Sequence, residues 1–366
     1  MPVPALLDAT PLGSAHSERG IVVAVRGMIG GLASLPEGER PRLLVRRGQA
    51  RPAGFEVVDV RWPSWPLYRI PDPWPVARGE RAARRLAGDA PFHAVQPALV
   101  PAGRTVVTCH DLIPAAFAAE YLGGPGRAGE RVAYSHFLRR LRGARIVLAP
   151  SQETADDVVR LAGADPERVR VVPWGVPEPA APEGDVPPGP YVLYSGAVEP
   201  HKNAGLALEA IALAAPGVRL VMVGPWSSRR AARLRGHAAR VGAAERVDWL
   251  GFVSPGRLAA LRASATAVLV PSRKEGFGLP VLEALAAGVP VLASDTPALR
   301  EVGGDAVAAY LPPADPGPWA REISALTGLH AAERSRRAEA GWARAAGFTW
   351  EATARGLVDA YRDAAA

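Results

Sequence analysis

Residues 268–291 read VLVPSRKEGFGLPVLEALAAGVPV, and this segment is the most informative about the fold class. An apolar run precedes a loop with Gly276 and Gly278, and a helical pattern follows with Pro280 in its first turn and a stop at Gly288. A strand, a glycine loop and a helix in this order are typical of βαβ units, and the first N–H groups of such a helix favour a phosphate. The segment therefore predicts an α/β protein with a phosphate-binding loop.

The same alternation of short apolar runs and helical patterns extends along the whole chain. The first half is expected to hold strands at 5–9, 42–45, 56–60, 92–95, 105–108, 146–149 and 169–172, with helices at 21–35, 76–87, 127–142 and 153–161. The second half is expected to hold strands at 191–194, 219–223, 247–250, 267–270 and 289–293, with helices at 204–214, 229–241, 255–263, 279–287, much of 318–346, and 350–363. Two Rossmann-like domains with parallel sheets follow from this pattern.

A proline-rich segment separates the two halves. Residues 173–190 hold seven prolines and three glycines, so they cannot form a helix or a central strand. We expect a first domain at 1–172, a linker at 173–190, a second domain at 191–346 and a C-terminal helix within 347–366.

Bulk properties fit this organisation. A chain of 366 residues is long enough for two domains. It has no apolar run of the roughly 18–20 residues that a membrane span needs, and its first residues lack the basic and apolar regions of a signal peptide. A single cysteine, Cys109, fits a reducing compartment. The expectation is a cytoplasmic protein.

The net charge of +7 is unevenly distributed. Residues 1–172 hold 23 Lys and Arg against 17 Asp and Glu, whereas the rest of the chain is nearly balanced. This basic half could meet an anionic membrane surface or a phosphorylated acceptor, or it could simply be solvated. No zinc-finger spacing or RNA-binding signature is present, so nucleic acid is not an expected partner.

Two glutamates stand out in the opening stretch. Glu275 and Glu283 are eight residues apart, just over two helical turns, so they lie on nearly the same side. One carboxylate can reach hydroxyls above the loop while the other reaches hydroxyls beside the helix. The alternative is a solvated Glu283, but its apolar neighbours at 282 and 284–287 are a poor setting for a solvent face.

Two further strand ends carry polar candidates. Residues 191–203 read YVLYSGAVEPHKN, where a strand ends in a glycine turn and Lys202 sits at a helix start; an exposed lysine in an ordinary loop is the alternative. Residues 106–114 read VVTCHDLIP at a strand end, the edge where ligands bind in open α/β sheets. His110 is a site candidate, and Asp111 is either a site residue or a loop cap. A thiol nucleophile at Cys109 is rejected because adjacent strand residues point to opposite faces.

Taken together, these segments resemble the retaining glycosyltransferases of family 4, in the branch of the bacterial mannosyltransferases. Residues 275–283 resemble the family's E-x(7)-E signature, 196–203 its G-x-x-E-P-R-K-N element, and 110–112 the element whose histidine faces the donor sugar. The resemblance implies the GT-B fold, an α/β architecture of two Rossmann-like domains with parallel sheets that face each other across a cleft. It also implies that the C-terminal helix at 347–366 crosses back to the N-terminal domain.

The resemblance implies roles for single residues. Glu275 would contact the donor sugar hydroxyls, Glu283 the donor ribose, and Lys202 the diphosphate. The candidate catalytic residues are His110, Glu275 and Lys202. The candidate donor-binding residues are Gly196, His201, Phe277, Gly278, Leu279, Glu283, Gly224 and Val253. Gly224 and Val253 lie in loops that would recognise the base largely through the backbone.

On the acceptor side the resemblance implies that the N-terminal domain binds the acceptor. The weaker candidates there are Gly20, Arg26 and Asp111. A loop with Trp62, Trp65 and Trp74 offers flat surfaces for sugar rings or a membrane interface, or simply packs the domain. The sequence departs from the family at three positions: His201 replaces the usual arginine, Ala197 stands where many relatives have arginine, and Val22 where glycine is frequent.

The implied function is transfer of a hexose from a nucleotide-sugar donor to a glycan, lipid-linked or small-molecule acceptor. GDP-mannose is the favoured donor and a UDP-sugar the next, with no metal and no cofactor. A protein that binds nucleotide sugar without efficient transfer remains an alternative. The glutamate pair argues against a GT-B phosphorylase or epimerase, and a dehydrogenase would need G-x-G-x-x-G after a strand, which is absent.

Overall fold

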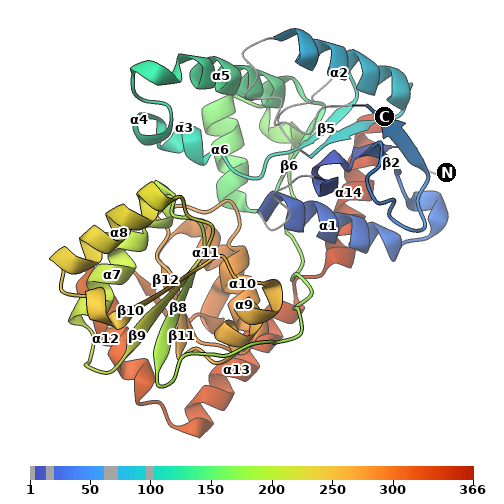
Figure 1. Ribbon diagram of the computed structural model, residues 1–366. Coiled ribbons are helices and arrows are strands. Elements are labelled where there is room, and N and C mark those ends of the chain that lie inside the picture. The colour runs from blue at the N-terminus through green and yellow to red at the C-terminus, as the bar shows by residue number, and fades with distance from the viewer. Residues whose placement is uncertain (1–4, 14–19, 62–72, 96–102) are drawn as a thin grey trace. The chain divides into compact units, whose positions relative to one another are not determined.

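The computed structural model describes residues 5–13, 20–61, 73–95 and 103–366, which form two compact units (Figure 1). Unit 1 comprises Met1–Gly175 together with Phe348–Ala366, and unit 2 comprises Val176–Gly347. The chain therefore leaves unit 1 once and returns to it near its end. Residues 172–190 contain neither helix nor strand, as their prolines predict.

Unit 1 is built on a parallel sheet of seven strands in the order β3-β2-β1-β4-β5-β6-β7. The strands are β1 (Leu6–Asp8), β2 (Arg42–Arg46), β3 (Val57–Val60), β4 (Phe92–Ala94), β5 (Thr105–Thr108), β6 (Ile146–Ala149) and β7 (Val169–Val171). The helices are α1 (Gly20–Ala33), α2 (Pro73–Ala87), α3 (Ile113–Ala116), α4 (Ala118–Tyr121), α5 (Ala128–Gly143), α6 (Gln152–Ala162) and α14 (Trp350–Ala365). The order reverses between β1 and β4, as in doubly wound sheets.

Unit 2 is a second parallel sheet, of six strands, in the order β10-β9-β8-β11-β12-β13. The strands are β8 (Tyr191–Ser195), β9 (Arg219–Val223), β10 (Val247–Gly251), β11 (Ala267–Val270), β12 (Val291–Ser294) and β13 (Ala309–Leu311). The helices are α7 (Ala204–Leu213), α8 (Ser228–Arg240), α9 (Pro255–Ala263), α10 (Leu279–Ala286), α11 (Pro297–Gly303), α12 (Pro316–Thr327) and α13 (Ala331–Ala346). This is the strand order of a dinucleotide-binding fold, with its reversal between β8 and β11.

The expected α/β class with two Rossmann-like units is confirmed, and most elements lie within two residues of their expected bounds. The structure adds α3, α4, α11 and β13, which are too short to show a period in the sequence. The helical pattern at 318–346 is two helices, because the chain breaks at Gly328 between α12 and α13.

Helix α14 returns to unit 1 and packs along α1 (Figure 1). Its first residue, Trp350, fits only because three neighbours are glycines: a Cβ at Gly27 would lie 2.1 Å from the indole, one at Gly31 2.0 Å from the Trp350 carbonyl oxygen, and one at Gly175 2.3 Å from its nitrogen. Thr349 caps the helix by accepting a 3.1 Å hydrogen bond from the amide of Ala352. The outgoing and returning segments of the chain are thus fastened together at Gly175 and Trp350.

In the part of the chain that the structure describes, no helix is both long enough and apolar enough to cross a bilayer.

Candidate active site

The sequence candidates of unit 2 gather at the carboxyl edge of its sheet, at the reversal between β8 and β11. In open α/β sheets this switch point is where ligands bind, because the loops after the two strands diverge and leave a crevice. Lys202 lies in the loop after β8, and Glu275 lies in the loop after β11.

The loop after β8 holds Lys202 in place through its backbone. A short 3₁₀ turn, Pro200–Lys202, ends at Asn203, which has a left-handed backbone with φ of 54°. The side-chain amide of Asn203 donates a 2.8 Å hydrogen bond to the carbonyl of Pro313, and the amide of Arg273 donates a 2.7 Å bond to the carbonyl of His201. The second bond joins this loop to the loop after β11.

The loop after β11 leads directly into α10. Gly278 is the N-cap of the helix with φ of 116°, a conformation that favours glycine, and Pro280 follows in the first turn. A Cβ at Gly278 would lie 3.0 Å from Leu299, so the loop also packs closely on α11. Phe277 is buried, and the segment 277–279 forms the N-terminus of α10, as expected for a phosphate-binding loop.

Lys202 and Glu275 form a partly buried ion pair. The ammonium of Lys202 donates to both carboxylate oxygens, at 2.7 and 2.8 Å, and the hydroxyl of Ser272 donates to one of them at 2.6 Å. The Glu275 side chain is 7% exposed and that of Lys202 23%. The structure thus joins two candidates that are 73 residues apart in the sequence.

Electrostatics keep Glu275 ionised and the adjacent histidine neutral. Burial by itself would raise the pKa of Glu275, but the charge and hydrogen bonds of Lys202 and the hydroxyl of Ser272 outweigh it and hold that pKa below its usual value. Burial and the charge of Lys202 lower the pKa of His201 to about 4. His201 is therefore neutral at pH 7 and adds no fixed positive charge where the family usually has arginine.

Glu283 lies apart from this pair. It is half-buried on α10, and its carboxylate forms an ion pair with Arg262 at the end of α9, whose guanidinium donates a 2.5 Å hydrogen bond to it. The two glutamates therefore have separate cationic partners, and Glu283 is not a solvated helix carboxylate.

Glycines line the neighbouring strand ends. The amide of Gly196, after β8, donates to Val223 at 2.9 Å, and the amide of Gly224, after β9, donates to Gly251 of β10 at 2.8 Å. A Cβ at Gly224 would lie 2.0 Å from the carbonyl oxygen of Gly196, which also accepts a 3.0 Å bond from the indole of Trp226. Val253 follows β10 and is half-buried. These ends form a backbone-rich surface beside the ion pair.

In unit 1, His110 follows β5 at the carboxyl edge of the sheet. Its Nε2 is 2.7 Å from the carbonyl oxygen of Val95, which can only accept, so Nε2 carries the proton. Its Nδ1 is buried and has no hydrogen-bond partner within the described ranges, and the ring packs on Trp174 with centroids 5.3 Å apart. Burial lowers the pKa of His110 to about 4, so at pH 7 the ring is neutral and Nδ1 can accept a hydrogen bond from a hydroxyl.

The neighbours of His110 on either side make contacts within the protein. Asp111 accepts a 3.0 Å bond from the amide of Ile113 and caps the turn into α3, which was the alternative to a ligand contact. Cys109 is buried, and burial raises the pKa of its thiol, which agrees with its rejection as a nucleophile.

The remaining acceptor candidates, Gly20 and Arg26, lie on α1 and belong to no described cluster of polar side chains. Gly20 is the first residue of α1, and Arg26 is exposed on the same helix, while Val22 is buried in the core. Trp62 and Trp65 lie outside the described residues, and Trp74 belongs to α2.

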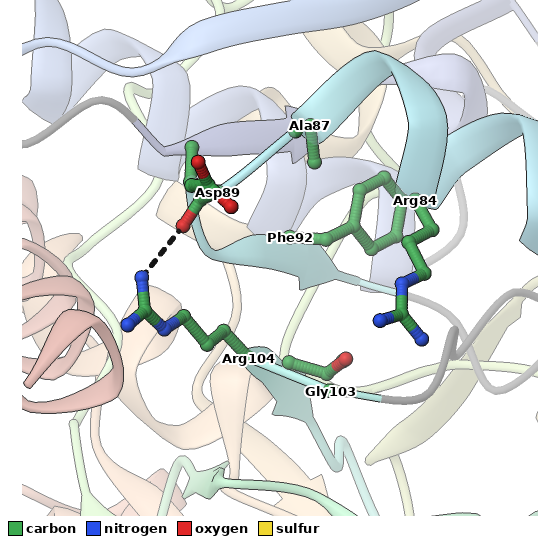
Figure 2. Close-up of a pocket in the computed structure, with 9 residues that line it drawn as sticks. Arg84, Ala87, Asp89, Phe92, Gly103 and Arg104 are labelled. Atoms are coloured by element: carbon green, nitrogen blue, oxygen red, sulfur yellow. Dashed lines mark hydrogen bonds between the residues drawn. The ribbon is translucent and has the colours of Figure 1, made fainter.

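One pocket lies elsewhere. It has a volume of about 180 Å³ and is lined by Arg84, Phe92 and Arg104 among others; Arg104 donates a 3.0 Å bond to the carbonyl of Asp89 (Figure 2). Phe92 and Thr105 begin β4 and β5, so this pocket is at the amino edge of the sheet. It lies at the opposite end of the strands from His110.

Comparison with known families agrees with this geometry. The model of the glycosyl transferases group 1 matches residues 181–340, and that of Glycosyltransferase Family 4 matches residues 19–178. The chain belongs to the GT-B glycosyltransferases.

Individual relatives match only part of this chain and part of their own length. A D-inositol 3-phosphate glycosyltransferase of Segniliparus rotundus is 35% identical over 235 residues, which cover 60% of this chain and 52% of the relative. A second one, from Acidothermus cellulolyticus, is 35% identical over 233 residues, or 58% of this chain and 52% of the relative. This GT-B chain thus spans about half the length of the curated relatives it matches.

Among solved structures, sucrose-phosphate synthase from Thermosynechococcus elongatus superposes with a TM-score of 0.75 at 20% identity, and 98% of each chain is covered. HepE of Anabaena, solved with UDP and glucose, gives a TM-score of 0.68 at 20% identity with the same coverage. At such identities the likeness concerns the GT-B fold alone.

Sequence reasoning missed two residues of the site. Ser272 could have been found, because it precedes Glu275 by three residues in the same short loop. Arg262 gave no signal, since it lies on another helix, 21 residues before Glu283.

Proposed function

We propose that this chain transfers a hexose from a nucleotide-sugar donor to an acceptor, with retention of the anomeric configuration. The observation that supports it most strongly is the Lys202–Glu275 ion pair at the switch point of unit 2, beside the N-terminus of α10. A cation and a helix N-terminus suit a diphosphate, and an ionised carboxylate suits sugar hydroxyls.

The chemical work divides between these groups. As the bond between sugar and diphosphate breaks, negative charge develops on the leaving diphosphate, and the Lys202 ammonium and the amides at 277–279 stabilise it. Because this stabilisation comes from protein groups, we propose that transfer requires no metal and no cofactor.

The hexose is held by acceptors of hydrogen bonds. Glu275 is ionised at neutral pH and accepts hydrogen bonds from sugar hydroxyls. We assign Nδ1 of His110 to a substrate hydroxyl. Glu283, steadied by Arg262, is assigned to the donor ribose, and the glycine-rich strand ends with Gly196, Gly224 and Val253 to the base.

Two donors are candidates. The mannosyltransferase-like motifs favour GDP-mannose, and the fold neighbour solved with UDP-glucose makes a UDP-sugar the next choice. A thermal-shift screen against GDP, UDP, ADP and dTDP tests both, because a ligand at 100 times its Kd stabilises by about 2.7 kcal/mol. Stabilisation by none of the four nucleotides would contradict the proposed function.

For the acceptor we propose a glycan, a lipid-linked sugar or a phosphorylated small molecule bound by unit 1. The names of the relatives make D-inositol 3-phosphate the first compound to test, and a phosphate suits the basic first half of the chain. Release of nucleoside diphosphate that depends on this compound would support it. Binding to anionic vesicles that weakens with salt would favour a lipid-linked acceptor instead.

A donor-binding protein without efficient transfer is the second candidate. It is favoured by the neutral, buried His201 in place of arginine, which leaves less positive charge beside the diphosphate. Nucleotide-sugar binding with neither transfer nor hydrolysis over a panel of acceptors would support this second candidate.

A further inference from the structure

The ammonium of Lys202 can bind either of two anions, the Glu275 carboxylate or the donor diphosphate. In the structure it donates to both oxygens of the Glu275 carboxylate. In the proposed function it must also neutralise the donor diphosphate. A lysine ammonium is a compact charge with three donors, and two of them are directed at Glu275.

We propose that Glu275 and the diphosphate compete for Lys202, and that this competition makes the site favour the intact nucleotide sugar over the nucleoside diphosphate product. The inference rests on the proposed function and names how the same site discriminates between its substrate and its product.

The physical reason is the burial of Glu275. When Lys202 turns to a phosphate, the carboxylate loses its cation and keeps the hydroxyl of Ser272 as its neighbouring donor at 2.6 Å. A carboxylate that is 7% exposed is costly to leave without compensation. The hydroxyls of a bound hexose supply the missing hydrogen bonds to Glu275. A nucleoside diphosphate lacks the hexose, and its ribose hydroxyls are assigned to Glu283.

The competition has a consequence for turnover. After transfer the hexose has left Glu275, and the carboxylate then takes Lys202 back from the diphosphate. The restored ion pair weakens the hold on the product and promotes its release.

The decisive variant is Glu275→Gln, which keeps the shape of the side chain and removes its charge. Isothermal titration with GDP and UDP measures the effect with whichever of the two binds the unaltered protein. We expect Glu275→Gln to bind that nucleotide about 10-fold more tightly, because Lys202 is no longer neutralised. Unchanged or weaker binding overturns the competition.

Two controls separate competition from the general loss of a negative charge. Asp248→Asn removes a carboxylate on β10 that is paired with Arg219 and not with Lys202, and is expected to leave the affinity within about 2-fold. In the background of Lys202→Met, adding Glu275→Gln should no longer tighten binding. If the control variant, Glu275→Gln alone and Glu275→Gln in the Lys202→Met background all tighten nucleotide binding equally, the proposal is overturned.

A third variant should weaken nucleoside diphosphate binding instead of tightening it, and it tests the competition even if Glu275→Gln does not fold. Ser272→Ala leaves the ion pair but removes the hydroxyl that stabilises Glu275 once Lys202 has turned away. We expect it to weaken nucleoside diphosphate binding several-fold; unchanged affinity counts against the competition. If the unaltered protein binds none of GDP, UDP, ADP and dTDP, the proposed function itself fails and the competition with it.

Discussion

Nδ1 of His93, on β4 in the middle of unit 1, lies 2.8 Å from the hydroxyl of Tyr361 on α14, and its Nε2 lies 2.8 Å from the hydroxyl of Thr108 on β5. All three side chains are buried. This chain of hydrogen bonds connects the returning helix to the sheet beneath the His110 loop. A buried polar group with every partner present specifies one position of the helix.

We expect Tyr361→Phe to lower the free energy of unfolding by about 1–3 kcal/mol, because it leaves a ring nitrogen of His93 unpaired in the core. Urea denaturation measures the change. The control is the double variant His93→Leu with Tyr361→Phe, which removes both partners and should cost less than the sum of the single changes. Strict additivity would show that the two groups do not interact.

Stability should fall in mild acid because three histidines are buried in neutral form. Burial lowers the pKa of His93 to about 3 and, together with weaker effects, those of His110 and His201 to about 4. In the unfolded chain their pKa returns to about 6.5, so between these values the unfolded state binds more protons. The stabilisation is complete above pH 6.5 and is lost as the pH falls toward 4, by about 1.4 kcal/mol per unit for each histidine.

Urea titrations at pH 7.5, 6.0 and 5.0 test this dependence. His93→Gln should make the fall in stability with pH less steep by the contribution of one proton. His136→Gln, at an exposed position on α5, is the control variant. The same slope in both variants would mean that His93 does not contribute.

Trp174 is expected to position His110. Its ring packs on the imidazole at a tilt of 57°, and loss of this contact frees the ring to move from its bond to Val95. Trp174→Ala should lower kcat about 10- to 100-fold with little change in donor KM, and Trp174→Phe should retain most of the rate. Trp319→Phe, a buried tryptophan of unit 2, is the control. A rise in donor KM without loss of kcat would argue against positioning.

Neighbouring glycines on α1 should respond in opposite directions to alanine. A Cβ at Gly31 would lie 2.0 Å from the Trp350 carbonyl oxygen, so Gly31→Ala should destabilise unit 1 by at least about 1–3 kcal/mol. A Cβ added at Gly30 would meet no atom within 4 Å, so Gly30→Ala should stabilise the helix by up to about 1 kcal/mol. Melting temperatures compare the two; equal shifts would show that Trp350 does not fix the helix spacing.

Transfer should proceed at its full rate after treatment with EDTA, since the proposed function assigns the diphosphate charge to Lys202 and the N-terminus of α10. The measurement is product formation before and after chelation, with Mg²⁺ and Mn²⁺ added back. A rate that requires either ion would refute the metal-independent proposal.

Elements with strong local patterns were predictable from the sequence. The apolar runs 105–108, 146–149 and 267–270 form strands with the expected bounds, because each is a short β-branched stretch bounded by polar or turn residues. Strand β13 was missed because its three residues, Ala309–Leu311, carry no alternation of their own, and it forms only by pairing with β12.

For the site, the sequence predicted which residues matter but not how they pair. The motifs identified Lys202 and Glu275 separately, and the resemblance directed each to a different part of the donor. Their contact with each other depends on the register of β8 against β11, which no local pattern encodes. The pairing of Glu283 with Arg262 was equally out of reach, since it joins two helices.

The path of the chain also sets an order of biogenesis. Unit 2 is contiguous, so a ribosome delivers all of Val176–Gly347 before it makes α14. Unit 1 is begun first but completed last, since the surface between Gly27, Gly31 and Gly175 stays uncovered until Trp350 has been synthesised. The usual vectorial order, in which the N-terminal domain matures first, therefore does not apply, and a chain truncated before α14 would hold all of unit 2 and an incomplete unit 1.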